Sequence, residues 1–287
     1  MTTEKYFSIW AKITSVVLVL LGISVFYSSG AQAPTGDMAP VWSPISNDIA
    51  YESDRDGDTE IYLLNLLDGE VTALTDNSAS DLSPSWSPDG SKIAFYSSRD
   101  GNFEVYVMNV DGFQLQRLSS NSAIDWHPAW SPDGNKIVFE SWRDGQPDLY
   151  AIDLQQQSVE RLTQTPQRES HPTWSHNGIV FGSLRDGSMG IHVLDPATGE
   201  LRTLATDLGI DPNPTWSPNG NFIAFTAIDR GSIDIHIIDA DGQNRERVTR
   251  DPYQDDFATW DTSGSRLAYS SNRDGEWRIF IREVTLP

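Results

Sequence analysis

Six carboxylates recur at one fixed position of the sequence, where such groups could bind a cation or hold a loop in place. Each lies five residues before a tryptophan; they are Asp37, Asp81, Asp125, Glu169, Asp211 and Asp255. If the positions are equivalent around a closed ring, like charges meet near one channel mouth, and a cation would relieve their repulsion. Oxygen ligands favour Ca²⁺ or Mg²⁺. The carboxylates could equally accept backbone hydrogen bonds from their own loops or contact a polar partner, and the sequence leaves these three roles open.

Two histidines stand out in a second column, two residues after the carboxylates. Its members are Ala39, Ser83, His127, His171, Asn213 and Phe257. His127 and His171 come from successive repeats, so we expect them to lie together, close to Asp125 and Glu169. Imidazole and carboxylate groups in one corner could bind a transition metal or act as an acid/base pair. We therefore predict these four residues as candidate metal ligands.

The tryptophans that define these columns are regularly spaced. They occur at positions 42, 86, 130, 174, 216 and 260, at intervals of 44, 44, 44, 42 and 44 residues. Each repeat contains three short runs of β-branched and aromatic residues, separated by turn signals such as Pro-Asp-Gly at residues 88–90. A Pro-x-Trp segment supplies a fourth, short strand. Six such units predict an all-β, six-bladed β-propeller of four-stranded antiparallel blades.

The last blade is expected to differ from the other five. The sixth copy ends at Pro287, where its fourth strand should begin. We predict a last blade of three strands, with residues 27–31, at the equivalent place in the first repeat, as the alternative closing strand. An unpaired edge there would suit an extended peptide.

The N-terminus predicts export from the cytoplasm. Lys5 and Lys12 precede an apolar run over residues 13–26, and Ala-Gln-Ala follows at 31–33. This pattern is typical of a secretory signal peptide, and the run is shorter than the roughly 20 residues of a membrane-spanning helix. We predict a signal peptide over residues 1–33, with an uncleaved membrane anchor as the alternative, and a propeller over 34–287 in the periplasm or outside the cell.

Charge and composition exclude several classes of function. The formal net charge is -21, and a surface this acidic repels nucleic acid and anionic lipid headgroups. The chain has no cysteine, which excludes disulfides and thiolate metal sites. The sequence also has no Gly-x-Ser-x-Gly, His-Glu-x-x-His or phosphate-binding glycine-rich motif. Any catalysis would therefore have to take place in the channel.

The repeat resembles that of TolB-like propellers. The second copy has Trp-Ser-Pro-Asp-Gly at residues 86–90, Arg-Asp-Gly at 99–101 and Glu-Val-Tyr at 104–106, and the resemblance covers about residues 37–287. It implies a periplasmic protein that binds a partner in the cell envelope. TolB carries an additional N-terminal α/β domain, for which we expect no counterpart here. Peptidase and lyase propellers share the repeat, so the resemblance defines the fold better than the function.

These observations together predict a monomeric, non-enzymatic propeller that binds a protein partner, with Ca²⁺ or Mg²⁺ as a candidate ion. We expect the partner to contact the face formed by the strand-entry and Arg-Asp-Gly loops. Besides the carboxylates, this face carries Trp126, Trp142, Tyr253 and Phe257, and aromatic groups often anchor protein interfaces. The alternatives are a metal-dependent channel enzyme (a lactonase, phosphoesterase or polysaccharide lyase) and a propeller that binds a sugar or other small ligand.

Overall fold

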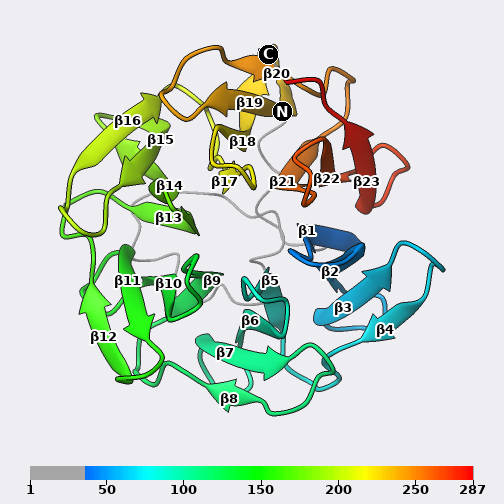
Figure 1. The fold of residues 1–287 in the computed structure, drawn as a ribbon, viewed down its shortest axis with the longest axis vertical. Coiled ribbons are helices and arrows are strands. Elements are labelled where there is room, and N and C mark those ends of the chain that lie inside the picture. The colour runs from blue at the N-terminus through cyan, green and yellow to red at the C-terminus, as the bar shows by residue number, and fades with distance from the viewer. Residues whose placement is uncertain (1–35, 287) are drawn as a thin grey trace, which may run out of the picture.

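The computed structural model describes residues 36–286, which form 23 β-strands in six antiparallel sheets. The sheets stand around a central axis as the blades of a propeller, and the first strand of each sheet is the innermost (Figure 1). The predicted six-bladed β-propeller is confirmed. The predicted signal segment over 1–33 and the alternative closing strand at 27–31 lie outside the described residues.

The first three blades each have four strands that follow one another in sequence from the centre outward. Their strands are β1 (Asp37–Trp42), β2 (Asp48–Ser53), β3 (Glu60–Asn65), β4 (Val71–Ala73), β5 (Asp81–Trp86), β6 (Lys92–Ser97), β7 (Glu104–Asn109), β8 (Gln116–Arg117), β9 (Asp125–Trp130), β10 (Lys136–Ser141), β11 (Asp148–Asp153) and β12 (Ser158–Arg161).

The last three blades follow the same order, and the sixth has three strands, as predicted. Their strands are β13 (Glu169–Ser175), β14 (Gly178–Arg185), β15 (Ser188–Leu194), β16 (Leu201–Ala205), β17 (Thr215–Trp216), β18 (Phe222–Asp229), β19 (Ser232–Asp239), β20 (Glu246–Arg247), β21 (Asp255–Trp260), β22 (Arg266–Ser271) and β23 (Arg278–Glu283). Within residues 36–286, no helix is long and apolar enough to cross a membrane.

The hydrophobic cores lie between neighbouring blades. Trp86 and Phe95 of blade two, for example, pack with Ile61 of blade one in a single buried cluster. The indole N–H of Trp86 also donates to the carbonyl of Val41 in blade one, at 3.0 Å. A buried indole needs such a partner, and Trp130 and Trp260 donate to the preceding blade in the same way. These three tryptophans both fill the gap between blades and fix their spacing.

The ring closes through the same backbone contact that links other blades. The N–H of Asp37, at the start of β1, donates to the carbonyl of Trp277, just before β23, at 2.9 Å. The N–H of Asp81 donates to Thr59 in the equivalent way, at 2.8 Å. Blade six therefore joins blade one in the same way that blade one joins blade two.

Blade five departs from the regular pattern at its inner strand. Strand β17 has only two residues, whereas the inner strands of the other blades have six or seven. Pro212, which has no backbone N–H to donate to β18, stands where the other blades have Met38, Leu82, Trp126, Ser170 and Asp256. The loop from residue 206 to β17 therefore takes a path of its own.

Candidate functional site

The repeated carboxylates are bound by arginines of their own blades. In five blades an arginine of the second hairpin loop lies within 3.3 Å of the carboxylate; the pairs are Arg55–Asp37, Arg99–Asp81, Arg143–Asp125, Arg185–Glu169 and Arg273–Asp255. The carboxylate side chains of Asp81, Asp125, Glu169 and Asp255 are fully buried.

Aromatic rings hold these arginines in place. The guanidinium of Arg99 lies 5.0 Å from the ring centre of Tyr106, and that of Arg273 lies 4.2 Å from the ring of Phe280. Five of the six repeats thus tie the start of the inner strand to the loop between the second and third strands. Of the three roles left open by the sequence, this geometry favours loop anchoring, because the carboxylates face arginine rather than one another.

A different column of residues points into the channel. Five inner strands, and the segment just before β17 in blade five, contain a residue with left-handed backbone, at φ between 44° and 55°; these are Ala39, Ser83, His127, His171, Asn213 and Phe257. Such φ values are rare outside glycine. In five of the blades the strand pairing shifts at this point, as it does at a β-bulge, and a bulge redirects a side chain.

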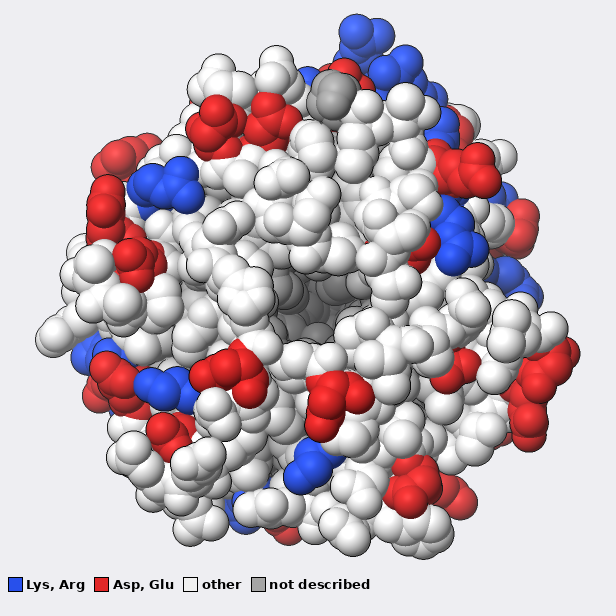
Figure 2. Space-filling model, viewed as in Figure 1, with Lys and Arg blue, Asp and Glu red and all other residues white. Residues whose placement is uncertain are grey.

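The channel brings together residues from blades that are not neighbours. His171 of blade four lies 6.5 Å, between ring centres, from Phe257 of blade six, with blade five between them along the ring. Both side chains must therefore point toward the common axis. Figure 2 shows a hollow at the centre of the face in view, where the inner strands meet.

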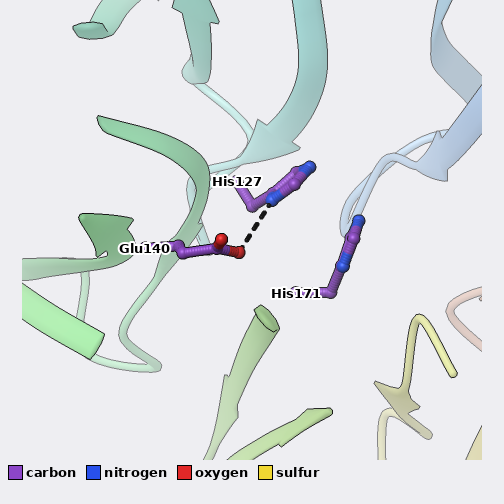
Figure 3. Close-up of side chains that lie close together, drawn as sticks. All are labelled: His127, Glu140 and His171. Atoms are coloured by element: carbon purple, nitrogen blue, oxygen red, sulfur yellow. Dashed lines mark hydrogen bonds and ion pairs between the residues drawn. The ribbon is translucent and has the colours of Figure 1, made fainter. Parts of the chain in front are cut away.

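His127, Glu140 and His171 form a compact cluster on this wall of the channel. Glu140 lies on β10, and its Oε2 is 3.2 Å from His127 Nδ1. The imidazole rings of His127 and His171 lie 3.8 Å apart between centres and are inclined by 30°. Figure 3 shows the three side chains converging on one small space. Among residues 36–286, this is the one group of three His, Asp or Glu side chains close enough to share a metal ion.

The pKa values of the two histidines of the cluster are shifted in opposite directions. Burial lowers the pKa of His127 to about 4, and the neighbouring His171 adds to this effect. Burial also disfavours a charged His171, but Asp211, 3.4 Å from His171 Nδ1, more than offsets burial and raises the pKa of His171. Burial alone would raise the pKa of Asp211, but His171 and Arg168 hold it well below its ordinary value. The raised pKa favours the charged form of His171 beside Asp211, whereas burial favours the neutral form of His127.

Only two of the four predicted metal ligands lie together in the structure. His127 and His171 lie together as expected, but Asp125 and Glu169 point away to their arginines. Asp211 is the exception among the six carboxylates, since it binds His171 and Arg168 of blade four instead of an arginine of its own blade.

Glu140 and two further buried acids of the channel were missed by the sequence reading. Glu52 accepts a hydrogen bond from the backbone N–H of Ser83 at 2.9 Å, and burial raises the pKa of Glu52 to about 7. Asp256 accepts hydrogen bonds from Thr226 and from Asn213 of blade five. Glu52 and Glu140 both lie ten residues after a repeat tryptophan, and a charged residue inside an otherwise apolar strand was the available signal.

The predicted partner face needs one correction. Trp126 is only 3% exposed and packs against Tyr96, Phe103 and Trp142, so this residue is a core residue and offers no contact surface. The bulge at His127 turns the His127 side chain to the channel and leaves the Trp126 indole inside the blade. Trp142 and Phe257 are partly buried, and Tyr253 is 42% exposed.

A shallow groove lies on blade four, apart from the channel. It has a volume of about 360 Å³, and its lining includes Trp174, His176 and Arg202. The two residues missing from the fourth repeat would extend the turn between β13 and β14, which forms one wall of the groove. The deletion therefore shapes this surface.

Comparison with known proteins agrees with the architecture. The family model of the TolB beta propeller domain matches residues 28–229 and 171–285. TolB from Acinetobacter baumannii superposes with a TM-score of 0.73 at 29% identity, over 80% of this chain and 58% of that chain. A candidate TolB from Agrobacterium tumefaciens superposes at 0.70 and 22% identity, over 89% of this chain and 93% of that one.

More distant structures share the fold alone. An oligogalacturonate lyase in complex with manganese has a TM-score of 0.60 at 13% identity, over 88% of this chain and 90% of that chain. A search of curated proteins found no match. The chain spans 58% of the length of the Acinetobacter TolB. The repeat, the six blades and the family match together show that this chain belongs to the TolB β-propeller family.

Proposed function

We propose that this chain is an exported, non-enzymatic propeller of the cell envelope that binds a protein partner as a monomer. Family membership supports a partner-binding role, and the signal-like N-terminus supports export to the periplasm or beyond. The proposed contact face is the one formed by the strand-entry and Arg-Asp-Gly loops.

An arc of apolar side chains on this face carries the proposal. Trp142, Leu184 and Ile228 occupy the same repeat position in blades three, four and five, at the start of the second hairpin loop. Leu184 is 43% exposed and Ile228 40% exposed, whereas the equivalent residues of the other three blades are polar. Tyr253 extends the arc toward blade six. Exposed apolar groups that are grouped in space commonly mark interaction sites.

The net charge of the chain suggests the chemistry of the partner. With a net charge of -21, the protein attracts basic surfaces and repels acidic ones. A partner with apolar anchor residues inside a basic rim would satisfy both features.

The test is cross-linked capture of partners from envelope extract, with the double variant Leu184→Ser/Ile228→Ser compared with Phe113→Ser. Phe113 is the matched control. It is 72% exposed and follows β7, at the opposite end of that strand from the Arg-Asp-Gly loop and therefore on the opposite face. We expect the wild type and Phe113→Ser to capture one partner equally, and the double variant at least tenfold less. Equal capture by the double variant, or loss with Phe113→Ser alone, would contradict the proposed face.

The second candidate function is metal-dependent catalysis in the channel, which the His127–Glu140–His171 cluster favours. A lyase of the same fold was solved with manganese, although at 13% identity. The candidate reactions are those of a lactonase, a phosphoesterase or a polysaccharide lyase. Turnover of such substrates by the metal-loaded chain, abolished in His171→Ala, would favour the enzyme over the binding protein.

A further inference from the structure

We propose that His127, Glu140 and His171 bind one divalent transition-metal ion, of which Zn²⁺ is the type, on the channel wall between blades three and four. Each histidine would give one ring nitrogen and Glu140 one carboxylate oxygen, with water from the channel in the remaining position. This inference does not depend on partner binding.

The spacing of the three side chains suits a shared ion. One ligand atom from each residue lies within 4.8 Å of the other two, and Glu140 Oε2 and His127 Nδ1 are already 3.2 Å apart. Ligands bound to zinc at about 2.0–2.2 Å lie roughly 3–3.5 Å from one another. Side-chain movements of about an ångström would therefore bring the three ligand atoms to this spacing, and the strands would not have to move.

Glu140 is difficult to explain without a bound cation. Its side chain is 0% exposed, and its Oε1 has no hydrogen-bond partner in the described part of the chain. A buried carboxylate is costly unless it is paired. A divalent ion would compensate the charge of this carboxylate, to which His127 supplies only a single contact.

Asp211 would support the site from outside. Its Oδ1 lies 3.4 Å from His171 Nδ1, and Ser170 Oγ donates to the same oxygen at 2.8 Å. A carboxylate behind a metal-binding histidine orients the ring and increases its basicity. This arrangement explains why Asp211, alone among the six repeat carboxylates, faces a histidine of the neighbouring blade.

The donor set selects the type of metal. Calcium and magnesium take oxygen ligands, whereas two imidazoles and one carboxylate suit zinc, manganese, iron, cobalt or nickel. The expectation of Ca²⁺ or Mg²⁺ rested on a ring of six free carboxylates, and five of those are paired with arginine. The nitrogen-containing cluster is the better candidate.

The experiment is calorimetric titration of the chelator-treated full chain with Zn²⁺, repeated for His127→Ala, His171→Ala and Glu140→Gln. His176→Ala is the matched control, because His176 is exposed on the turn between β13 and β14, away from the cluster. Binding of Co²⁺, followed by visible absorption, gives a second readout of nitrogen and oxygen ligands. Circular dichroism before titration shows whether each variant is folded, and the near-isosteric Glu140→Gln keeps the test valid if a histidine variant is not.

We expect one Zn²⁺ per wild-type chain and at least tenfold weaker binding in each folded cluster variant. His176→Ala should bind as the wild type does, and equimolar Ca²⁺ should not displace the zinc. Absence of stoichiometric binding, undiminished binding in Glu140→Gln, or loss of binding in His176→Ala would overturn the proposal, as would displacement by calcium.

Discussion

Arg99 Nη2 lies 2.7 Å from Asp81 Oδ2, eighteen residues earlier in the chain, and the carboxylate that it holds is fully buried. This contact joins the start of the inner strand of blade two to its second hairpin loop. The same contact recurs in four other blades. A feature that looks like an ion site in the sequence therefore stabilises the scaffold in the structure.

We expect Asp81→Ala to lower the free energy of unfolding by about 3 kcal/mol, because the change leaves a half-buried arginine without its buried partner. Urea denaturation at neutral pH measures the loss. Arg278→Ala is the control, since Arg278 pairs with Glu276 at the surface, and exposed pairs contribute about 0–1 kcal/mol. Similar losses in the two variants would show that the repeated pair has no special role.

Acidification from pH 8 to pH 5 should stabilise the protein through Glu52. Burial raises the pKa of Glu52 from 4.5 to about 7 in the folded state. The folded chain thus binds more protons than the unfolded chain between these values, and the stabilisation is lost as pH rises through about 7. Each pKa unit corresponds to about 1.4 kcal/mol, so an effect on the order of 2 kcal/mol is expected.

The Glu52→Gln variant separates this effect from other titrating groups. Glutamine cannot ionise, so the difference in stability between the variant and the wild type should shift in the variant's favour as pH rises from 5 to 8. Thermal melting at several pH values measures it. A difference that does not change with pH would mean that Glu52 is not the group responsible.

Substitutions of Ser83 test the repeat position at which the backbone is left-handed. Its φ is 54°, a region that glycine adopts freely and β-branched residues avoid. Ser83→Gly should change the stability by less than about 1 kcal/mol, whereas Ser83→Val should cost about 1–2 kcal/mol or more. Chemical denaturation of both variants measures the contrast, and a valine variant as stable as the glycine variant would contradict it.

The amides of β23 should exchange with solvent faster than those of β11. Strand β11 is paired on both sides, by β10 and β12, whereas β23 is paired only with β22 among the described strands. An edge strand leaves alternate N–H groups without a strand partner, so lower protection is expected. Hydrogen exchange read by mass spectrometry tests this. Protection of β23 equal to that of β11 would instead favour residues 27–31 as the closing strand.

The sequence by itself determined the architecture. Tryptophans at 44-residue intervals, with turn signals at fixed offsets, define six equivalent four-stranded units, and such units bury their apolar faces by stacking around a ring. The end of the sixth copy predicted a blade of three strands. The pairing of His127 with His171 also follows from the repeat, because equivalent positions in successive blades are neighbours.

Only the tertiary structure decided which other groups complete the site. Glu140 reaches His127 because a bulge with φ of 48° turns the histidine to the channel, and the repeat spacing does not say which side chains such a bulge brings together. The burial of Trp126 and the pairing of Asp211 with His171 depend on contacts between side chains of neighbouring strands and blades. Local periodicity fixes where strands lie, but the direction and partners of polar side chains depend on packing between elements distant in sequence.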